Sequence, residues 1–208
     1  MNRTRVKFCG ITRPEDAATA VSLGVDAIGL VFFDPSPRAV GLEQARAIVA
    51  EVPPLVATVG LFVDARRAEV LSVLAAVRID VLQFHGNELP VDCEDFGRPY
   101  IKAIRMRDGV DLHEQAARYR HAGALLLDTW EDGRHGGTGQ VFDWSRVPGD
   151  LGKPVILAGG LSPANVAEAV QQVRPYAVDV SGGIETAKGI KDPEKMRAFL
   201  SEVYRGTD

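Results

Sequence analysis

The chain has 208 residues, of which 46% are hydrophobic and 25% are charged, with 24 Lys and Arg against 28 Asp and Glu. The basic residues are scattered rather than gathered in a stripe, which excludes a typical nucleic-acid-binding surface. No apolar run approaches the ~20 residues that span a bilayer, and the start "MNRTRVKF" lacks the apolar core of a secretory signal. We therefore expect a globular, cytoplasmic protein with no nucleic-acid partner and no membrane partner.

Strand-like and helix-like segments alternate along the whole chain. Apolar or β-branched runs typical of strands lie at 5–9, 26–32, 56–62, 79–84, 100–104, 124–128, 154–158 and 177–181. Helical patterns lie at 14–23, 42–51, 65–76, 111–121, 163–173 and 193–204, with weaker candidates at 88–96 and 143–147. Eight such units predict an α/β fold, a compact single (β/α)8 TIM barrel that forms one domain over residues 1–208.

Three of the predicted helices begin with a capping signal shortly after a strand. One is a T-x-x-E capping box, and two are a Ser or Asp followed by proline at the first helical position. These signals are Thr12 with Glu15, Ser162 with Pro163, and Asp192 with Pro193. In a barrel, the loops that join a strand to the next helix lie at the face where active sites are built.

Cys9 ends the first predicted strand, in "VKFCGIT". Because side chains alternate along a strand, Lys7 and Cys9 share the face that points into the barrel. A nearby cation favours the thiolate, although pairing with Asp179 of the last strand would neutralise Lys7 and weaken this effect. Cys9 is therefore a candidate base or nucleophile, and the alternative is an inert buried thiol.

Polar side chains follow the second and fourth predicted strands. Arg38 lies in "FFDPSPRAV", where Pro35 and Pro37 restrict the loop, and a braced guanidinium fork suits a carboxylate. Gln83 and His85 share one face in "VLQFHG" and are candidates for further polar contacts with a ligand. The alternatives are a surface arginine and a histidine whose hydrogen bonds are satisfied at the barrel rim.

Asp128 ends the sixth predicted strand, in "LLLDTW". On strand alternation it points inward with Leu126, at the rim of the barrel. Apolar surroundings there favour the protonated carboxyl group, which makes Asp128 a candidate acid. The alternative is an aspartate that caps a helix or braces a loop.

The segment that follows, "DGRHGGTGQVFDW" at 132–144, is long and rich in glycine, which predicts a mobile lid. It has no G-x-G-x-x-G pattern, and no G-x-x-x-x-G-K-[ST] motif occurs anywhere in the chain. The two cysteines, Cys9 and Cys93, form no C-x-x-C motif, and no histidine cluster has metal-ligand spacing. We therefore expect no nucleotide, no disulfide and no metal.

Two glycine pairs follow the seventh and eighth predicted strands: Gly159 and Gly160 in "LAGGLSPANV", and Gly182 and Gly183 in "DVSGGIETAKG". Backbone N–H groups in such turns and at a helix N-terminus attract anions. The seventh and eighth loops are also the usual phosphate site of a TIM barrel. The two pairs together favour a phosphate cradle over simple tight turns.

These motifs, in this order, resemble the phosphoribosylanthranilate isomerase family of tryptophan biosynthesis. The resemblance covers nearly the whole chain and rests on "KFCGIT", "FFDPSPRAV", "QFHG", "LLLDTW", "GGTGQVFDW", "LAGGLSPANV" and "DVSGGIETAKGIKD". The family converts N-(5-phosphoribosyl)anthranilate to 1-(2-carboxyphenylamino)-1-deoxyribulose 5-phosphate. One departure is "SGG" at 181–183, where many members have Ser-Ser-Gly, which removes a side-chain hydroxyl at Gly182.

The resemblance implies a role for each candidate residue. Cys9 would be the general base, Asp128 the general acid, and Arg38 would lie near the anthranilate carboxylate. The glycine turns would bind the phosphate of a small phosphoribosyl substrate. No cofactor is implied, and the chain would act as a monomer or homodimer.

Two other functions are alternatives for a barrel with these glycine turns. A related phosphate-binding barrel isomerase of histidine biosynthesis would have an aspartate at the end of the first strand, where this chain has Cys9. A non-catalytic phosphosugar-binding barrel would keep the glycine turns but has no need of both Cys9 and Asp128.

Overall fold

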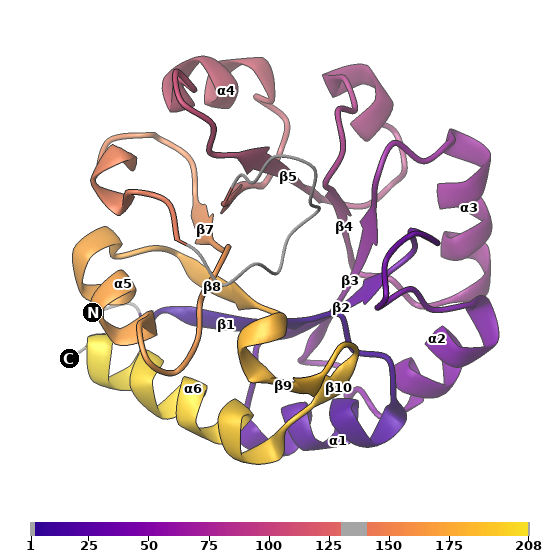
Figure 1. The fold of residues 1–208 in the computed structure, drawn as a ribbon. Coiled ribbons are helices and arrows are strands. Elements are labelled where there is room, and N and C mark those ends of the chain that lie inside the picture. Colours follow the sequence, from indigo (N-terminus) through magenta and orange to yellow (C-terminus); the bar gives the residue numbers. More distant parts are fainter. Residues whose placement is uncertain (1–2, 130–140, 208) are drawn as a thin grey trace.

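The computed structural model describes residues 3–129 and 141–207. Eight parallel strands form a closed barrel in which each strand pairs with the next and β8 pairs with β1. The strands surround the centre of the view in Figure 1 and are β1 (Arg5–Cys9), β2 (Ala27–Val31), β3 (Ala57–Phe62), β4 (Val81–Phe84), β5 (Tyr100–Arg105), β6 (Ala124–Asp128), β7 (Val155–Leu157) and β8 (Ala177–Val180). The predicted barrel is confirmed, and each predicted strand coincides with an observed one.

Helices surround the barrel, as Figure 1 shows. The α-helices are α1 (Pro14–Leu23), α2 (Leu42–Ala50), α3 (Arg67–Ala76), α4 (Leu112–Arg118), α5 (Val166–Val173) and α6 (Pro193–Thr207). The two weaker helical candidates, at 88–96 and 143–147, are only the short 3-10 turns η1 (Pro90–Cys93) and η2 (Trp144–Arg146). None of the helices in the described residues is long and apolar enough to cross a membrane.

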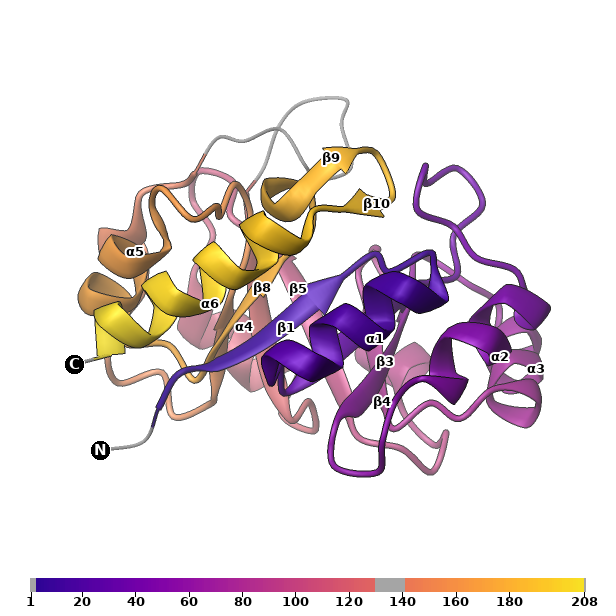
Figure 2. The ribbon, with the colours of Figure 1, turned by 90° about the horizontal axis from the view of Figure 1, so that it is seen from below.

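A small addition to the barrel follows β8. A 3-10 turn, η3 (Gly182–Ile184), leads into the antiparallel pair β9 (Glu185–Ala187) and β10 (Ile190–Lys191). Figure 2 shows this pair beyond the carboxyl end of β1. The pair was not among the predicted strands, and it lies over the end of the barrel where the candidate residues were expected.

One of the three predicted helix caps is confirmed and two are wrong, although α1 begins at Pro14 as predicted. The Asp192 carboxylate accepts hydrogen bonds from the backbone N–H groups of Glu194 and Lys195, and α6 begins at Pro193. In contrast, the Thr12 hydroxyl donates to the Gly189 carbonyl, so Thr12 bonds a distant loop and does not cap α1.

The start of α5 is displaced from Ser162. This helix begins at Val166 with Asn165 in the cap position. The Asn165 side chain accepts from the Ser162 N–H and donates to the Gly160 carbonyl, so it holds 162–165 in a turn. The predicted N-cap at Ser162 is therefore wrong by three residues.

Strand alternation divides the apolar side chains into two sets. Phe8 faces outward and meets Phe199 of α6, edge to face, at 6.1 Å between ring centroids. Lys7 consequently points into the barrel, where its Nζ lies 2.7 Å from Asp179 Oδ1. Lys7 and Asp179 occupy paired register positions on β1 and β8. The predicted buried ion pair is confirmed, and it balances the charge inside the barrel.

Candidate active site

Cys9 is buried at the carboxyl end of β1 and packs with Val31 and Leu61 inside the barrel. A Cβ atom placed on Gly29 of the neighbouring strand would lie 2.9 Å from both Cys9 Sγ and Lys7 Nζ. The thiol and the ammonium group therefore approach the same point on β2. Glycine at position 29 therefore leaves room for both groups without a shift of either side chain.

The environment of Cys9 favours the thiol over the thiolate. Burial raises the pKa of the Cys9 thiol, while the charge and hydrogen bond of Lys7 act to lower it and the charge of Asp179 raises it further. Lys7 thus lowers the pKa of the Cys9 thiol, as predicted, but burial raises that pKa by more. The reason is that the thiol is desolvated and the lysine charge is shared with Asp179.

Asp128 is the last residue of β6 and is held by a histidine. His85, just beyond β4, places Nε2 at 3.0 Å from Asp128 Oδ2. The other ring nitrogen, Nδ1, lies 3.0 Å from Gln83 Nε2. The sequence suggested that Asp128 has apolar surroundings, but the structure also places a polar ring beside it. Gln83 is fully buried, so its amide acts on this site through His85.

Arg38 forms a two-pronged ion pair with Glu185. Its Nε lies 2.8 Å from Glu185 Oε1, and its Nη2 lies 2.7 Å from Oε2. The arginine stem packs on Gly10, where an added Cβ would lie 2.5 Å from Arg38 Cδ. Arg38 is mostly buried and is not an ordinary surface arginine.

Glu185 and Lys191 belong to this cluster and were missed in the sequence. Lys191 Nζ lies 2.8 Å from Glu185 Oε1 and also donates to the Cys9 carbonyl at 2.7 Å. Burial acts to raise the pKa of Glu185, but the hydrogen bond from Arg38 and the charge of Lys191 outweigh it and hold that pKa below its ordinary value. The only signal was two opposite charges on either side of the Lys188–Gly189 turn.

The glycine turns after β7 and β8 pack closely against each other. Gly159 and Gly160 have φ angles of 77° and 67°, which glycine adopts without strain. A Cβ on Gly183 would overlap the carbonyl oxygen of Leu161, and one on Gly159 would lie 2.8 Å from Asp128 Oδ1. The first glycine turn therefore adjoins both the second turn and the carboxyl group of Asp128.

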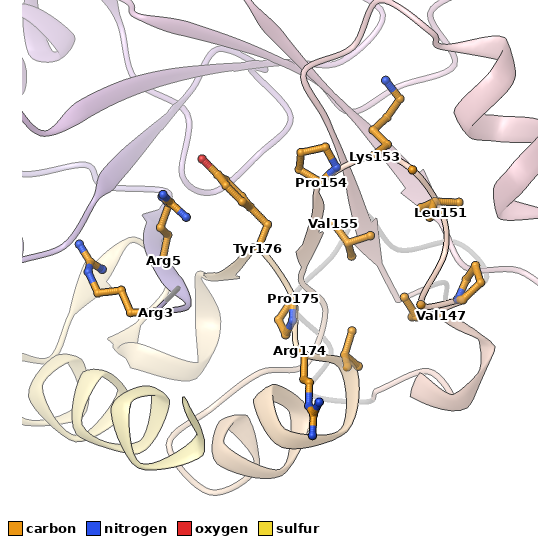
Figure 3. Close-up of a pocket in the computed structure, with 14 residues that line it drawn as sticks. Arg3, Arg5, Val147, Leu151, Lys153, Pro154, Val155, Arg174, Pro175 and Tyr176 are labelled. Atoms are coloured by element: carbon orange, nitrogen blue, oxygen red, sulfur yellow. The ribbon is translucent and has the colours of Figure 1, made fainter. Parts of the chain in front are cut away.

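A cavity of about 310 Å³ lies at the opposite end of the barrel. Figure 3 shows part of its lining, with Arg5 and Tyr176 on one side and Pro154 and Val155 on the other. None of the predicted site residues lines it. The predicted lid at 132–144 falls largely on residues 130–140, which lie outside the described residues.

Comparison with known proteins identifies a family. A family model described as N-(5'phosphoribosyl)anthranilate (PRA) isomerase matches residues 6–202. The chain is 58% identical to an N-(5'-phosphoribosyl)anthranilate isomerase of Pseudomonas syringae pv. tomato, over 98% of this chain and 99% of that protein. It is 60% identical to the enzyme of that name from Nitrosococcus oceani, over 99% of this chain and 98% of the relative.

Solved structures agree with the sequence relatives. The chain is similar to phosphoribosyl anthranilate isomerase from Thermotoga maritima, with a TM-score of 0.89, 39% identity, and coverage of 96% of this chain and 98% of that one. A second structure of such an isomerase, in complex with reduced 1-(O-carboxyphenylamino)-1-deoxyribulose 5-phosphate, has a TM-score of 0.85, 38% identity and the same coverage.

Proposed function

The chain belongs to the N-(5'-phosphoribosyl)anthranilate isomerase family, and from that premise we propose how its side chains carry out the isomerisation. The chain is an enzyme of tryptophan biosynthesis that converts N-(5-phosphoribosyl)anthranilate to 1-(2-carboxyphenylamino)-1-deoxyribulose 5-phosphate. The family match sets aside the histidine-pathway isomerase and the non-catalytic barrel. The residue assignments rest mainly on one observation: a thiol from β1 and a carboxyl group from β6 end at the same face as the paired glycine turns.

Asp128 is the general acid in this proposal. Its proton passes to the furanose ring oxygen as the bond between that oxygen and C1′ breaks, and the nitrogen lone pair forms the C=N bond of a Schiff base. The adjoining Gly159 turn supports the assignment, since it can hold the phosphate of the same substrate beside the acid. The acid at the end of β6 and the phosphate-binding turn after β7 then lie on neighbouring strands, which positions the substrate for proton transfer.

Cys9 is the general base. As a thiolate it removes the proton from C2′, and the electrons of that C–H bond move to form the enolamine while the Schiff base nitrogen is neutralised. Tautomerisation of the enolamine gives the ketone product. Lys7 supports this role, because its charge and hydrogen bond act to lower the pKa of the Cys9 thiol against the opposing effects of burial and Asp179.

Arg38 binds the anthranilate carboxylate. Glu185 occupies its Nε and Nη2 groups, and among the described residues no hydrogen bond to Nη1 is found. The Nη1 group can therefore donate to a substrate carboxylate while Glu185 holds the guanidinium in place. Lys191 links the same cluster to the backbone of Cys9, which ties the carboxylate anchor to the base.

Arg38→Ala is expected to raise KM about tenfold to a hundredfold, because one charge-assisted hydrogen bond to the substrate is lost. The change in kcat should be much smaller, since Arg38 does not touch the reacting carbons. Steady-state kinetics followed by anthranilate fluorescence measures both constants. Arg197→Ala, at an exposed position of α6, is the matched control. An unchanged KM in the Arg38 variant would show that the carboxylate binds elsewhere.

The glycine turns at 159–160 and 182–183 hold the substrate phosphate by backbone N–H groups, and Gly182→Ser tests this. Serine there supplies the hydroxyl that many family members have, and the φ angle of Gly182 is not among the positive ones. We expect a severalfold to about tenfold lower KM, and equally tighter inhibition by inorganic phosphate, from one added hydrogen bond to a charged group. Gly149→Ser, at an exposed glycine with open space around it, is the control. Equal effects in both variants would contradict the placement.

Gln83 and His85 were expected to contact the substrate. No observation tests this, and the hydrogen bonds of His85 to Gln83 and Asp128 favour a role that acts through Asp128 instead. We also propose a monomer or homodimer that acts in the cytoplasm on a small phosphoribosyl substrate. The Thermotoga maritima enzyme is dimeric, and monomers have been generated from it. Both a monomer and a homodimer are therefore compatible with this fold.

A further inference from the structure

A buried glutamine is connected to the proposed acid by two hydrogen bonds. Gln83 Nε2 lies 3.0 Å from His85 Nδ1, and His85 Nε2 lies 3.0 Å from Asp128 Oδ2. An amide nitrogen donates and does not accept, so Nδ1 of His85 is the acceptor in the first bond. In a neutral imidazole the other nitrogen then carries the hydrogen. His85 therefore donates from Nε2 to Asp128 Oδ2.

The orientation of the Gln83 amide determines which nitrogen of His85 carries the hydrogen. As found, one side-chain atom, Oε1, is buried without a hydrogen-bond partner among the described residues. The second hydrogen of Nε2 is also without a partner among the described residues, and turning the amide over would leave both hydrogens of its NH2 group without one while Oε1 accepts from His85 Nδ1. Each orientation leaves two polar positions unsatisfied, so the tautomer of His85 follows from the orientation found, in which Nε2 faces Nδ1, and its direct measurement is the test.

The hydrogen bond to Oδ2 leaves Oδ1 as the oxygen that carries the acid proton. Oδ1 is the oxygen next to Gly159, at the turn proposed to hold the substrate phosphate. Arg105, paired in register with Asp128, donates to the His85 carbonyl at 3.3 Å and so helps to hold the loop that carries the ring. A proton on Oδ1 would therefore lie on the side of the carboxyl group that faces the phosphate turn.

We propose that Gln83 and His85 are positioning residues that place the proton of Asp128 on Oδ1 and stabilise the carboxylate that remains after proton transfer. The proposal rests on Asp128 being the acid of the proposed function. The proton moves from Oδ1 to the ring oxygen, which also takes the electrons of the breaking C–O bond, and His85 keeps its own hydrogen. As negative charge develops on Asp128, the bond from His85 becomes charge-assisted, so it is stronger in the transition state than in the ground state.

Nitrogen-15 NMR of the imidazole rings tests the tautomer without any activity measurement. In the unmodified protein we expect His85 Nδ1 to resonate as an unprotonated nitrogen and Nε2 as a protonated one, with His85→Leu identifying the signals. Gln83→Met should remove this preference, and Gln172→Met, at an exposed glutamine of α5, should not. A hydrogen found on Nδ1 in the unmodified protein, or no response to Gln83→Met, would overturn the proposal.

Kinetics separate positioning from substrate contact. His85→Leu should lower kcat about tenfold to a hundredfold, the effect of one hydrogen bond to a charged group, with little change in KM. His85→Gln, which keeps an N–H donor, should recover part of the loss.

The result that would refute positioning by His85 is a raised KM with an unchanged kcat, which marks a substrate contact instead. Failure of the proposed function looks different. If Asp128→Asn keeps normal turnover, Asp128 is not the acid, whatever tautomer the NMR spectra of His85 show.

Discussion

Cys9→Ala is expected to lower kcat by about 10²–10⁴-fold, the usual contribution of a general acid or base. Substrate binding should be nearly unchanged, because the carboxylate and phosphate anchors lie on other elements. Loss of substrate fluorescence under single-turnover conditions measures the chemical step, and equilibrium titration measures binding. Normal turnover in this variant would remove Cys9 from the mechanism.

Cys93→Ala is the matched control for Cys9→Ala. Cys93 is also buried, but it lies in η1 and packs in a different apolar cluster from Cys9, and burial raises the pKa of its thiol to about 12. Its loss removes a similar volume without touching the proposed base. Cys93→Ala should therefore keep its kcat. Equal losses in both variants would indicate a packing effect rather than base catalysis.

The same variants allow the ionisation of Cys9 to be followed. In a Cys93→Ala background, the rate of alkylation by iodoacetamide reports the thiolate of Cys9 alone. Because burial raises the pKa of Cys9, the thiolate fraction should still be rising at about pH 8.5, the ordinary thiol value. A plateau near neutral pH would mean that Lys7 outweighs burial.

Asp128→Asn is expected to lower kcat by about 10²–10⁴-fold, as for the base. Asparagine keeps the size of the side chain and an oxygen that can accept from His85, but it has no acidic proton to deliver. The ring-opening step should therefore fail while the site keeps its shape. Single-turnover fluorescence with unchanged substrate titration would establish this.

Asp150→Asn controls for the loss of one carboxyl group, because Asp150 is exposed and lies beside His113, ahead of the amino end of β7. It should retain normal kcat and KM. Both acid and base variants should also unfold at denaturant concentrations close to that of the unmodified protein. Near-normal turnover in Asp128→Asn would assign the acid to another group.

The barrel was predictable because its signals are local. Alternation of apolar runs with helical patterns depends on residues a few positions apart, and all eight strands appear where these patterns lie. The ends of β1 and β6 were predicted at Cys9 and Asp128, and both residues end their strands. Closure then places β8 beside β1, which is why the pairing of Lys7 with Asp179 was also foreseen.

The contacts made by loops were not predictable in this way. The capping box at Thr12 is a valid local pattern, yet its hydroxyl bonds Gly189, 177 positions along the chain. Arg38 and Glu185 are 147 positions apart, and no local pattern indicates that they meet. Such bonds depend on how the barrel closes and where β9 and β10 fold back over it.

The amino-acid order alone determined the alternating strands and helices, the inward direction of Cys9 and Asp128, and the motifs that indicate the family. The folded chain decided which polar side chains meet: Arg38 with Glu185, and Asp128 with His85. It also decided that burial raises the pKa of the Cys9 thiol by more than Lys7 lowers it. The physical reason is that periodicity acts between near neighbours, whereas desolvation and ion pairing depend on distances in space between residues far apart in the chain.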